Sequence, residues 1–239
     1  MVSYPRALPC GDSAVSIEFG DRIEEIVNDR VLALDRALAE RSVVGIVVTV
    51  PTYRALLVHY DPLLTTYALI SDLALTLAKG CGIAENGRRR LRIPVCYADE
   101  FSADLDAVAA QLHMSAEEVV ARHTAAEYRV YMLGFQPGFA YLGGLDPGLA
   151  LPRRREPRPG ALAGTISIAA GQCAIHSVDG PSGWHWIGRT PVQTYAAGAA
   201  SEFLLQAGDR IRFFAIDATT WNELRHSGAT GEIVIAESL

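Results

Sequence analysis

The stretch of residues 128–190 constrains the fold of this 239-residue chain more than any other segment. It interleaves glycine, proline and aromatic residues, as in Leu-Gly-Phe-Gln-Pro-Gly-Phe-Ala-Tyr-Leu-Gly-Gly-Leu-Asp-Pro and Gly-Pro-Ser-Gly-Trp-His-Trp-Ile-Gly-Arg-Thr. Glycine permits positive φ and close backbone approach, whereas proline fixes φ and removes a hydrogen-bond donor. The stretch therefore predicts shaped loops, and such loops commonly bind ligands.

Short apolar segments separated by turn residues continue through the C-terminal half of the chain. Strands are predicted at residues 165–169, 173–178, 184–187, 192–196, 203–205, 210–216 and 232–236, with a short helix at 218–225. Many short strands at this spacing are typical of a barrel or a sandwich. Residues 128–239 are therefore predicted to form a β-barrel domain.

The N-terminal part shows strand and helix periodicity in alternation. Strands are predicted at residues 14–19, 43–50, 55–60 and 88–96, and amphipathic helices at 23–38 and 67–77. The resulting βαββαβ order is that of ferredoxin-like folds, so residues 1–97 are predicted to form an α+β domain. Two short helices, 104–112 and 115–124, predict a helical connector over residues 98–127, with a capping box between Ser115 and Glu118.

Composition excludes several classes of protein. A net charge of −6 argues against general nucleic-acid binding. The four cysteines (Cys10, Cys81, Cys96 and Cys173) are scattered and lack the spacing of metal ligands, which predicts reduced thiols and no metal site. With no signal peptide or membrane-spanning run evident, we expect a cytoplasmic protein. No Walker, G-x-G-x-x-G, G-x-S-x-G or H-E-x-x-H motif is present, so complete ATP chemistry by this chain alone is not expected.

Several motifs carry a family resemblance. They are residues 51–54, 57–62, 128–138 and 141–147, the pairs at 152–153, 163–164 and 183–184, Gln172, and residues 187–191. The chain resembles the allophanate hydrolase subunit 1 family, which includes the B subunit of 5-oxoprolinase and the inhibitor of a sporulation histidine kinase. Similar sequence forms one half of the carboxyltransferase domain in urea carboxylase. The resemblance implies a ferredoxin-like domain followed by a cyclophilin-like barrel.

The resemblance also implies a function. We expect a hydrolase subunit of a cytosolic, ATP-dependent amide-cleaving complex, most simply the B subunit of 5-oxoprolinase, inactive alone. Its implied partners are the C subunit (allophanate hydrolase subunit 2-like) and the A subunit of that enzyme, and its implied substrate is a small amide carrying a carboxylate. ATP would act in the complex, on this chain or on another one. The alternatives are a biotin-dependent carboxyltransferase subunit, with biotin on another chain, and a non-catalytic inhibitor of a histidine kinase.

Five residues are the candidates for substrate binding, whereas no catalytic residue is identified. Arg153 and Arg189 suit a carboxylate because guanidinium offers a bidentate fork, although internal salt bridges explain them equally well. Gln172 either orients an amide or holds a loop. Tyr141 and Trp184 form either a pocket wall or barrel core.

Other residues leave alternatives open. Residues 167–177 depart from the family's usual Gly-Ile-Ala-Gly-Asn-Gln-Thr-Gly-Ile-Tyr-Pro. His176 stands at the tyrosine position of that motif, and a role as acid or base is the less favoured of its interpretations. Cys173 is interpreted as a small buried thiol, and His113 and His123 as surface or capping residues. The arginine run at 88–92 either holds an anion or is a solvated strand edge.

Overall fold

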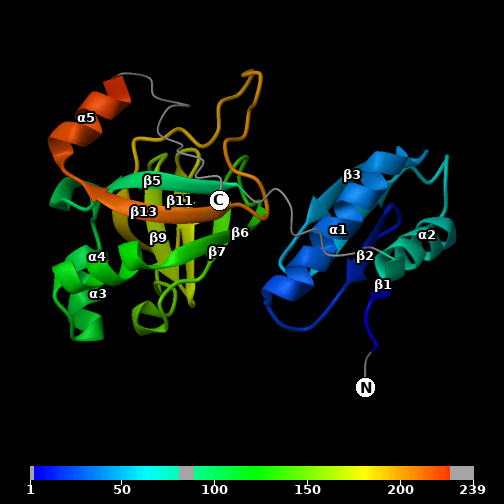
Figure 1. The fold of residues 1–239 in the computed structure, drawn as a ribbon, viewed down its shortest axis with the longest axis horizontal. Helices are drawn as coiled ribbons and strands as arrows, with labels where there is room; N and C mark the ends of the chain where they lie inside the picture. Colours follow the sequence, from blue (N-terminus) through cyan, green and yellow to red (C-terminus); the bar gives the residue numbers. More distant parts are fainter. Residues whose placement is uncertain (1–2, 81–88, 227–239) are drawn as a thin grey trace. The chain divides into compact units, whose positions relative to one another are not determined.

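The computed structural model describes residues 3–80 and 89–226 of the chain. They belong to two compact units, Met1–Gly87 and Arg88–Leu239, each with its own hydrophobic core (Figure 1). Within the described ranges, no helix has the length and apolar character needed to cross a membrane.

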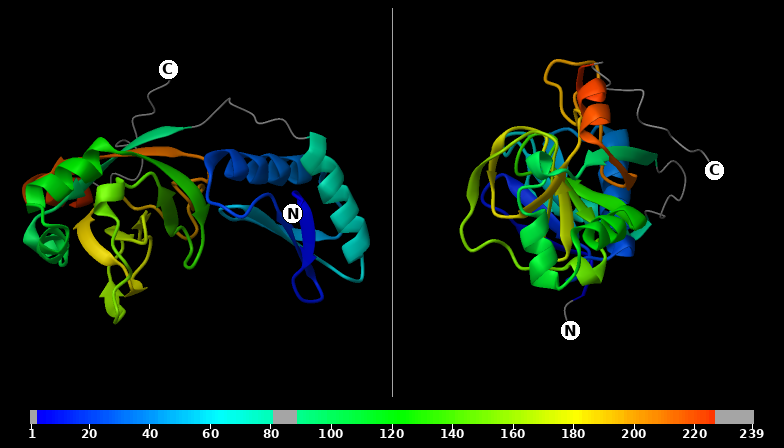
Figure 2. Two further views of the ribbon diagram at one scale, coloured as in Figure 1. Left: turned by 90° about the horizontal axis from the view of Figure 1, so that it is seen from below. Right: turned by 90° about the vertical axis from the view of Figure 1, so that its left-hand side faces the viewer.

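The first unit is a four-stranded antiparallel sheet with two helices. Its elements are β1 (Arg6–Pro9), β2 (Ala14–Glu18), α1 (Glu25–Arg41), β3 (Ile46–Pro51), β4 (Ala55–Tyr60) and α2 (Tyr67–Gly80). The strands lie in the order β1-β2-β4-β3, and both helices cover one face of the sheet (Figure 2). Alternate residues such as Ile17 and Val58 point to that face and pack against Leu34 of α1.

The predicted βαββαβ order is not the one observed, since the first unit reads ββαββα. Strand β1 forms a hairpin with β2 and occupies the edge of the sheet. It escapes prediction because four residues are too few to show periodicity. The strand predicted at residues 88–96 belongs to the second unit instead. The predicted domain of residues 1–97 therefore extends too far, and the ferredoxin-like arrangement is not confirmed.

The second unit is built on a closed β-barrel. Its elements are β5 (Arg90–Cys96), η1 (Asp99–Phe101), α3 (Leu105–Leu112), α4 (Ala116–Ala125), β6 (Glu127–Leu133), β7 (Ala140–Gly143), η2 (Pro147–Leu149), β8 (Arg158–Ala161), β9 (Thr165–Ala169), β10 (Gln172–Ile175), β11 (Gly180–Ser182), β12 (His185–Arg189), β13 (Arg210–Ile216) and α5 (Ala218–His226). The barrel order is β10-β7-β6-β13-β5-β12-β9, and β8 and β11 form a separate ribbon. The predicted barrel is confirmed, whereas its cyclophilin-like type stays a prediction.

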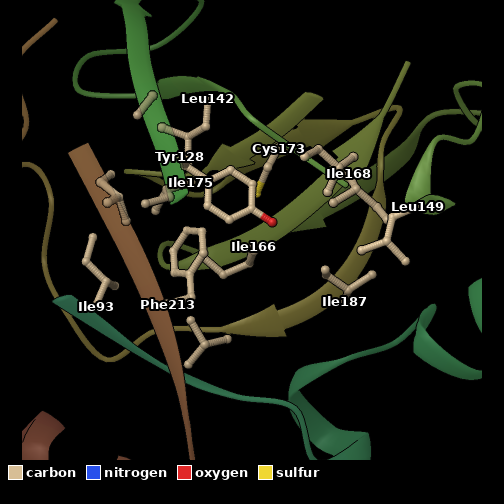
Figure 3. Close-up of a cluster of buried hydrophobic side chains, with 14 of the residues drawn as sticks. Ile93, Tyr128, Leu142, Leu149, Ile166, Ile168, Cys173, Ile175, Ile187 and Phe213 are labelled. Atoms are coloured by element: carbon tan, nitrogen blue, oxygen red, sulfur yellow. The ribbon is translucent and has the colours of Figure 1, made fainter. Parts of the chain in front are cut away.

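The barrel interior is filled by alternate residues of its strands. Figure 3 shows the rings of Tyr128 and Phe213 among isoleucines of β9 and β10, such as Ile166 and Ile175. These side chains are at most 3% exposed. Side chains of the intervening residues point outward, which leaves the outer wall free to carry functional groups.

Helices α3 and α4 are part of the barrel unit. Val108 of α3 and Val119 of α4 are fully buried in the same cluster as the barrel interior, so residues 98–127 are not a connector between domains. The predicted N-cap is confirmed, because Ser115 Oγ accepts a hydrogen bond from the amide of Glu118 at 3.2 Å. His113 lies at the C-cap of α3 in the left-handed conformation, with φ of 55°.

Two predicted strands are absent as strands among the described residues. Residues 192–196 and 203–205 meet in an isolated bridge between Tyr195 and Phe203. Glycine and proline neighbours leave this segment too irregular for a ladder. The strand predicted at 232–236 lies outside the described residues.

His123 is fully buried, so its interpretation as a surface or capping residue is wrong. Its Nδ1 lies 2.7 Å from the Tyr97 hydroxyl and its Nε2 3.5 Å from Cys173 Sγ, while its ring stacks on Phe213. Burial lowers the pKa of His123 to about 3 and raises the pKa of the Cys173 thiol. The predicted buried thiol at Cys173 is confirmed, and both groups are neutral near pH 7.

We predict a pH-dependent loss of stability that comes from His123. Because its folded pKa of about 3 lies below the unfolded value, the contribution of this residue is complete above about pH 6.5 and declines as the pH falls toward 3. Between about pH 7.5 and 5.5, His123 alone should lower the free energy of unfolding by roughly 1.4 kcal/mol. The free energy of unfolding, measured with urea, should decline less steeply with falling pH in His123→Gln than in the wild type. His226→Gln, at an exposed position, should keep the wild-type decline, and equal slopes for all three proteins would contradict the prediction.

Candidate functional site

Four neighbouring strands of the barrel, β7, β10, β9 and β12, present a shared outer face. Their register places Tyr141 opposite Ala174, Ala174 opposite Ser167, and Ser167 opposite Trp186. Because paired residues of adjacent strands point to the same side of a sheet, these side chains form one row. The neighbouring residues Leu142, Cys173 and Ile168 point into the core instead.

Three aromatic side chains gather on this face and are called the aromatic cluster below: Phe139, Tyr141 and Trp184. Tyr141 lies between the other two, with ring centroids 4.8 Å from Phe139 and 6.1 Å from Trp184. The exposed guanidinium of Arg153 lies over Trp184, its Cζ 5.9 Å from the ring centroid. The structure thus brings together three of the five predicted binding residues: Arg153, Tyr141 and Trp184.

The electrostatics of the cluster keep Tyr141 a neutral phenol. Burial raises the pKa of Tyr141, and the positive charge of Arg153 partly opposes that rise. A neutral phenol donates a hydrogen bond, and a guanidinium donates several. Phe139 and Trp184 are only 4% and 7% exposed, so the half-buried ring of Tyr141 and the exposed guanidinium of Arg153 are the parts of this face open to a ligand, and they suit a small molecule with an acidic group.

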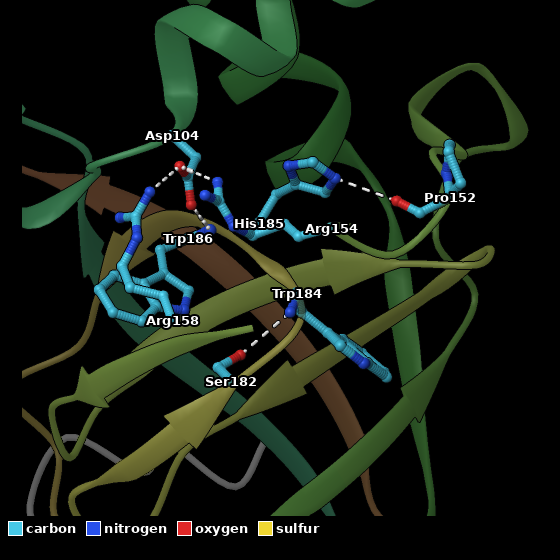
Figure 4. A network of polar contacts seen from close by, with 8 residues as sticks. All are labelled: Asp104, Pro152, Arg154, Arg158, Ser182, Trp184, His185 and Trp186. Carbon is cyan, nitrogen blue, oxygen red and sulfur yellow. Dashed lines mark hydrogen bonds and ion pairs between the residues drawn. The ribbon is translucent and has the colours of Figure 1, made fainter. Parts of the chain in front are cut away.

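Anchors on both sides fix the segment that carries Arg153. Leu151 before it is buried in the barrel core. Arg154 after it donates from Nη1 to Asp104 Oδ1 at 2.8 Å, and its amide donates to the carbonyl of Gly183 at 2.9 Å. The carbonyl of Pro152 accepts from His185 Nε2 at 3.0 Å (Figure 4).

Asp104 is the centre of this anchoring network. Its side chain is only 3% exposed and accepts from Arg154 and from Arg158, the latter at 2.6 Å. Its second oxygen accepts from the amide of Trp186 at 2.8 Å. Figure 4 shows the two arginines converging on this one carboxylate. A single buried acid therefore ties the start of α3 to β12 and to the loop that holds Arg153.

A second buried polar pair lies beside the aromatic cluster. Ser167 Oγ is 3.2 Å from His176 Nε2, and the rings of Phe139 and His176 pack nearly perpendicular, with their centroids 4.9 Å apart. Both residues of the pair are at most 1% exposed, and burial lowers the pKa of His176 to about 4. A neutral imidazole in this place packs against Phe139 and Ser167, and because it is buried it lacks the access to solvent that acid–base chemistry requires.

Local turn chemistry explains how Ser167 and His176 meet. Ala170 and Gly171 join β9 to β10 with φ of 50° and 73°, the positive values of a two-residue hairpin turn. This tight turn pairs Gln172 with Ala169 and so places residue 176 beside the start of β9. The Ala-Gly turn in the sequence is the signal from which the pair could be predicted.

The other two predicted binding residues have different surroundings. Gln172 begins β10, on the same outward parity as Ala174, and takes part in a polar interaction. Arg189 lies on β12, three strands from β7, which is about 14 Å at ordinary strand spacing. Its Nε donates to the carbonyl of Ala163 at 2.9 Å, and its guanidinium lies over Trp221. Arg189 therefore supports a loop and α5, away from the aromatic cluster.

Sequence reasoning misses Asp104 and the buried state of His123. Asp104 stands at the start of a predicted helix, where an aspartate is typical of an N-cap, yet its side chain makes no cap hydrogen bond. Its partners lie 50 or more residues away, and no local pattern indicates them. For His123, the position four residues after the apolar Val119 could have indicated burial, because residues at this spacing share one face of a helix.

We predict that Asp104→Asn loosens the Arg153 loop. Removing the charge leaves Arg154 and Arg158 without their shared anion. Because these arginines are about a third exposed, solvent compensates them in part, and the free energy of unfolding should fall by about 2 kcal/mol. Trypsin should cleave after the arginines of this loop several-fold faster than in the wild type. Asp106→Asn, at an exposed position of the same helix, is the matched control. Equal cleavage rates for both variants would contradict the role assigned to Asp104.

Comparisons with known proteins agree on one family. The model of the family "Carboxyltransferase domain, subdomain C and D" matches residues 5–205. The 5-oxoprolinase B subunit of Bacillus subtilis (strain 168) is 38% identical over 218 residues, which are 86% of this chain and 90% of that protein. The 5-oxoprolinase B subunit of Haemophilus influenzae is 41% identical over 125 residues, 52% of this chain and 59% of that protein.

Solved structures show the same fold. The crystal structure of TTHA0988 superposes with a TM-score of 0.77 at 36% identity, and the match covers 86% of this chain but only 40% of that one. Urea carboxylase of Kluyveromyces lactis has a TM-score of 0.79 over 97% of this chain and 23% of its own, at 17% identity, which shows the fold alone. The chain therefore belongs to the family of carboxyltransferase domains, subdomains C and D, and the resemblance to allophanate hydrolase subunit 1 is confirmed.

Proposed function

We propose that this chain is the B subunit of an ATP-dependent 5-oxoprolinase, an amide-hydrolysing complex. The observation that carries the proposal is the 38% identity to the Bacillus subtilis protein over 90% of that protein's length. A match of this extent includes parts of both units. In this proposal the chain acts with the C and A subunits of the enzyme, and ATP is consumed by the assembled complex.

The aromatic cluster supplies one wall of the substrate site in this proposal. A cyclic amide with a carboxylate needs a cation, hydrogen-bond donors and an apolar surface. Arg153 supplies the cation and the hydrogen-bond donors, and the half-buried ring of Tyr141, backed by Trp184, supplies the apolar surface. The partner protein supplies the opposite wall and the groups that cleave the amide.

Arg189 has a structural role in this proposal. Its pKa is lowered, chiefly by burial and also by the nearby Arg225. Its Nε is already engaged with the Ala163 carbonyl. A substrate carboxylate at Arg189 would have to replace these contacts, whereas Arg153 projects from an exposed position.

A biotin-dependent carboxyltransferase component is the second candidate. The name of the matching family model and the fold of urea carboxylase favour it. The same wall would then receive a carboxyl group carried by biotin on another chain. This candidate requires biotin for turnover, and the amide hydrolase requires none.

The test is to co-express this chain with candidate C and A subunits and to measure ATP-dependent glutamate release from 5-oxoproline. We predict release by the complete complex and a KM for 5-oxoproline at least tenfold higher in Arg153→Gln, because a charge-assisted contact contributes about 1.5–3 kcal/mol. Arg155→Gln, also an exposed arginine of this loop, should leave the KM unchanged.

The outcome that contradicts the proposal is a well-formed complex that releases no glutamate. Biotin-dependent carboxyl transfer by that complex would instead establish the second candidate. An unchanged KM in Arg153→Gln, with turnover intact, would remove Arg153 from the substrate site and leave the assignment of the complex standing.

A further inference from the structure

An arginine-lined cavity lies on a different part of the barrel wall, over β5 and β13. Its volume is about 490 Å³, within the range of small-molecule pockets. Its charged lining residues are Arg90 and Arg92 of β5, Arg210 and Arg212 of β13, and Glu127 at the start of β6. None of these residues belongs to the aromatic cluster, and all of them lie in the second unit.

Strand register arranges the four arginines as a grid. Strands β5 and β13 run side by side (Figure 1). Their parallel register sets Arg90 beside Arg210 and Arg92 beside Arg212. Neighbours across the strands are about 4.8 Å apart at their Cα atoms, and neighbours along a strand about 6.6 Å. The four side chains therefore leave the same outer face of the sheet and line one cavity.

This grid is costly without a bound anion. Like charges directly opposite each other destabilise a sheet. Among the lining residues that the structure describes, Glu127 is the acidic one, with Oε2 3.5 Å from Arg212 Nε and Oε1 3.9 Å from Arg210 Nε. Among the described lining residues, one carboxylate thus stands against four guanidiniums, of which Arg210 also takes part in a further interaction, in a chain whose net charge is −6. A concentration of positive charge against an acidic background indicates a site for a ligand of several negative charges.

The cavity also has an apolar part. Phe214 lines it, and the Cζ atom of Arg92 lies 5.1 Å from the centroid of that ring. The other lining residues that carry no charge are Leu91, Thr124, Ile211, Phe213 and Ala215. Arginine forks match phosphate oxygens in bidentate geometry. A concave site of this volume fits a small molecule better than a flat protein surface.

We propose that this cavity binds a small ligand carrying a di- or triphosphate group. Arg90, Arg92, Arg210 and Arg212 contact the phosphates, and Glu127 excludes ligands of single charge by competing for the arginines. The proposal stands independently of the 5-oxoprolinase assignment, since it rests on this cavity alone. The arginine run noted in the sequence is thus divided: Arg89 forms an ion pair with Asp209, Arg90 and Arg92 line the cavity, and Arg88 lies outside the described residues.

The test is calorimetric titration of the full chain with inorganic tripolyphosphate and, separately, with ATP. We predict binding of tripolyphosphate that weakens with added salt, and a loss of about tenfold in affinity for each of Arg92→Gln and Arg212→Gln. Tighter binding of ATP than of tripolyphosphate would identify a nucleotide, and equal binding would identify the phosphates alone as the recognised group. Both results support the site.

Two further variants make the result decisive. Glu127→Gln should strengthen tripolyphosphate binding several-fold, because it removes the competing carboxylate while changing one atom. Arg155→Gln, which changes the net charge equally but lies outside the cavity, should bind as the wild type does. The free Arg212→Gln protein should also be at least as thermally stable as the wild type. Absence of tripolyphosphate binding, or equal weakening by Arg155→Gln, would overturn the proposal.

Discussion

The pairing of β5 with β13 closes the barrel, and the rest of the second unit depends on it. Seven residue pairs in parallel register join Arg90–Cys96 to Arg210–Ile216 across more than 100 residues of chain. The ion pair of Arg89 with Asp209, whose side chain is 4% exposed, fixes the beginning of this ladder at 3.0 Å between Nε and Oδ1. Such a long closure costs chain entropy, which the apolar interior between the strands has to offset.

Closure of the barrel determines where functional groups can lie. Inward residues fill the core, so chemistry is confined to the outer wall and the loops. One part of the wall carries the aromatic cluster with Arg153, and another carries the arginine-lined cavity over β5 and β13. Buried polar groups such as Asp104 and His123 hold loops and helices against the wall. They are neutralised by partners or kept uncharged by burial, as the low pKa of His123 shows.

The parts predictable from the sequence are those with strong local periodicity. The predicted bounds of the helices α1 and α2 and of the strands β9 and β13 lie at or near the observed ones. The partner of β5 cannot be predicted in this way, because its register depends on residues at the far end of the chain. Strand β7 lies in a glycine-rich segment that predicts a loop, although its residues Ala140 and Leu142 are fully buried.

The candidate site shows the same division. Residue type alone favours Arg153 and Arg189 equally, since both are guanidiniums in a glycine- and proline-rich stretch. Only the fold separates them: Asp104, through Arg154, holds Arg153 beside Trp184, whereas Arg189 is engaged with Ala163. The contacts that decide between them join residues about 26 to 50 positions apart, beyond the reach of any local pattern.

We propose that substrate reaches the outer face of the barrel at the half-buried ring of Tyr141 and the exposed guanidinium of Arg153. Hydrogen–deuterium exchange of the assembled complex, with and without 5-oxoproline, tests it directly. We expect slower exchange in segments 139–143, 152–154 and 183–186 when the substrate is bound, with α1 and α2 unchanged. Turnover of 5-oxoproline with no protection in these three segments would contradict it.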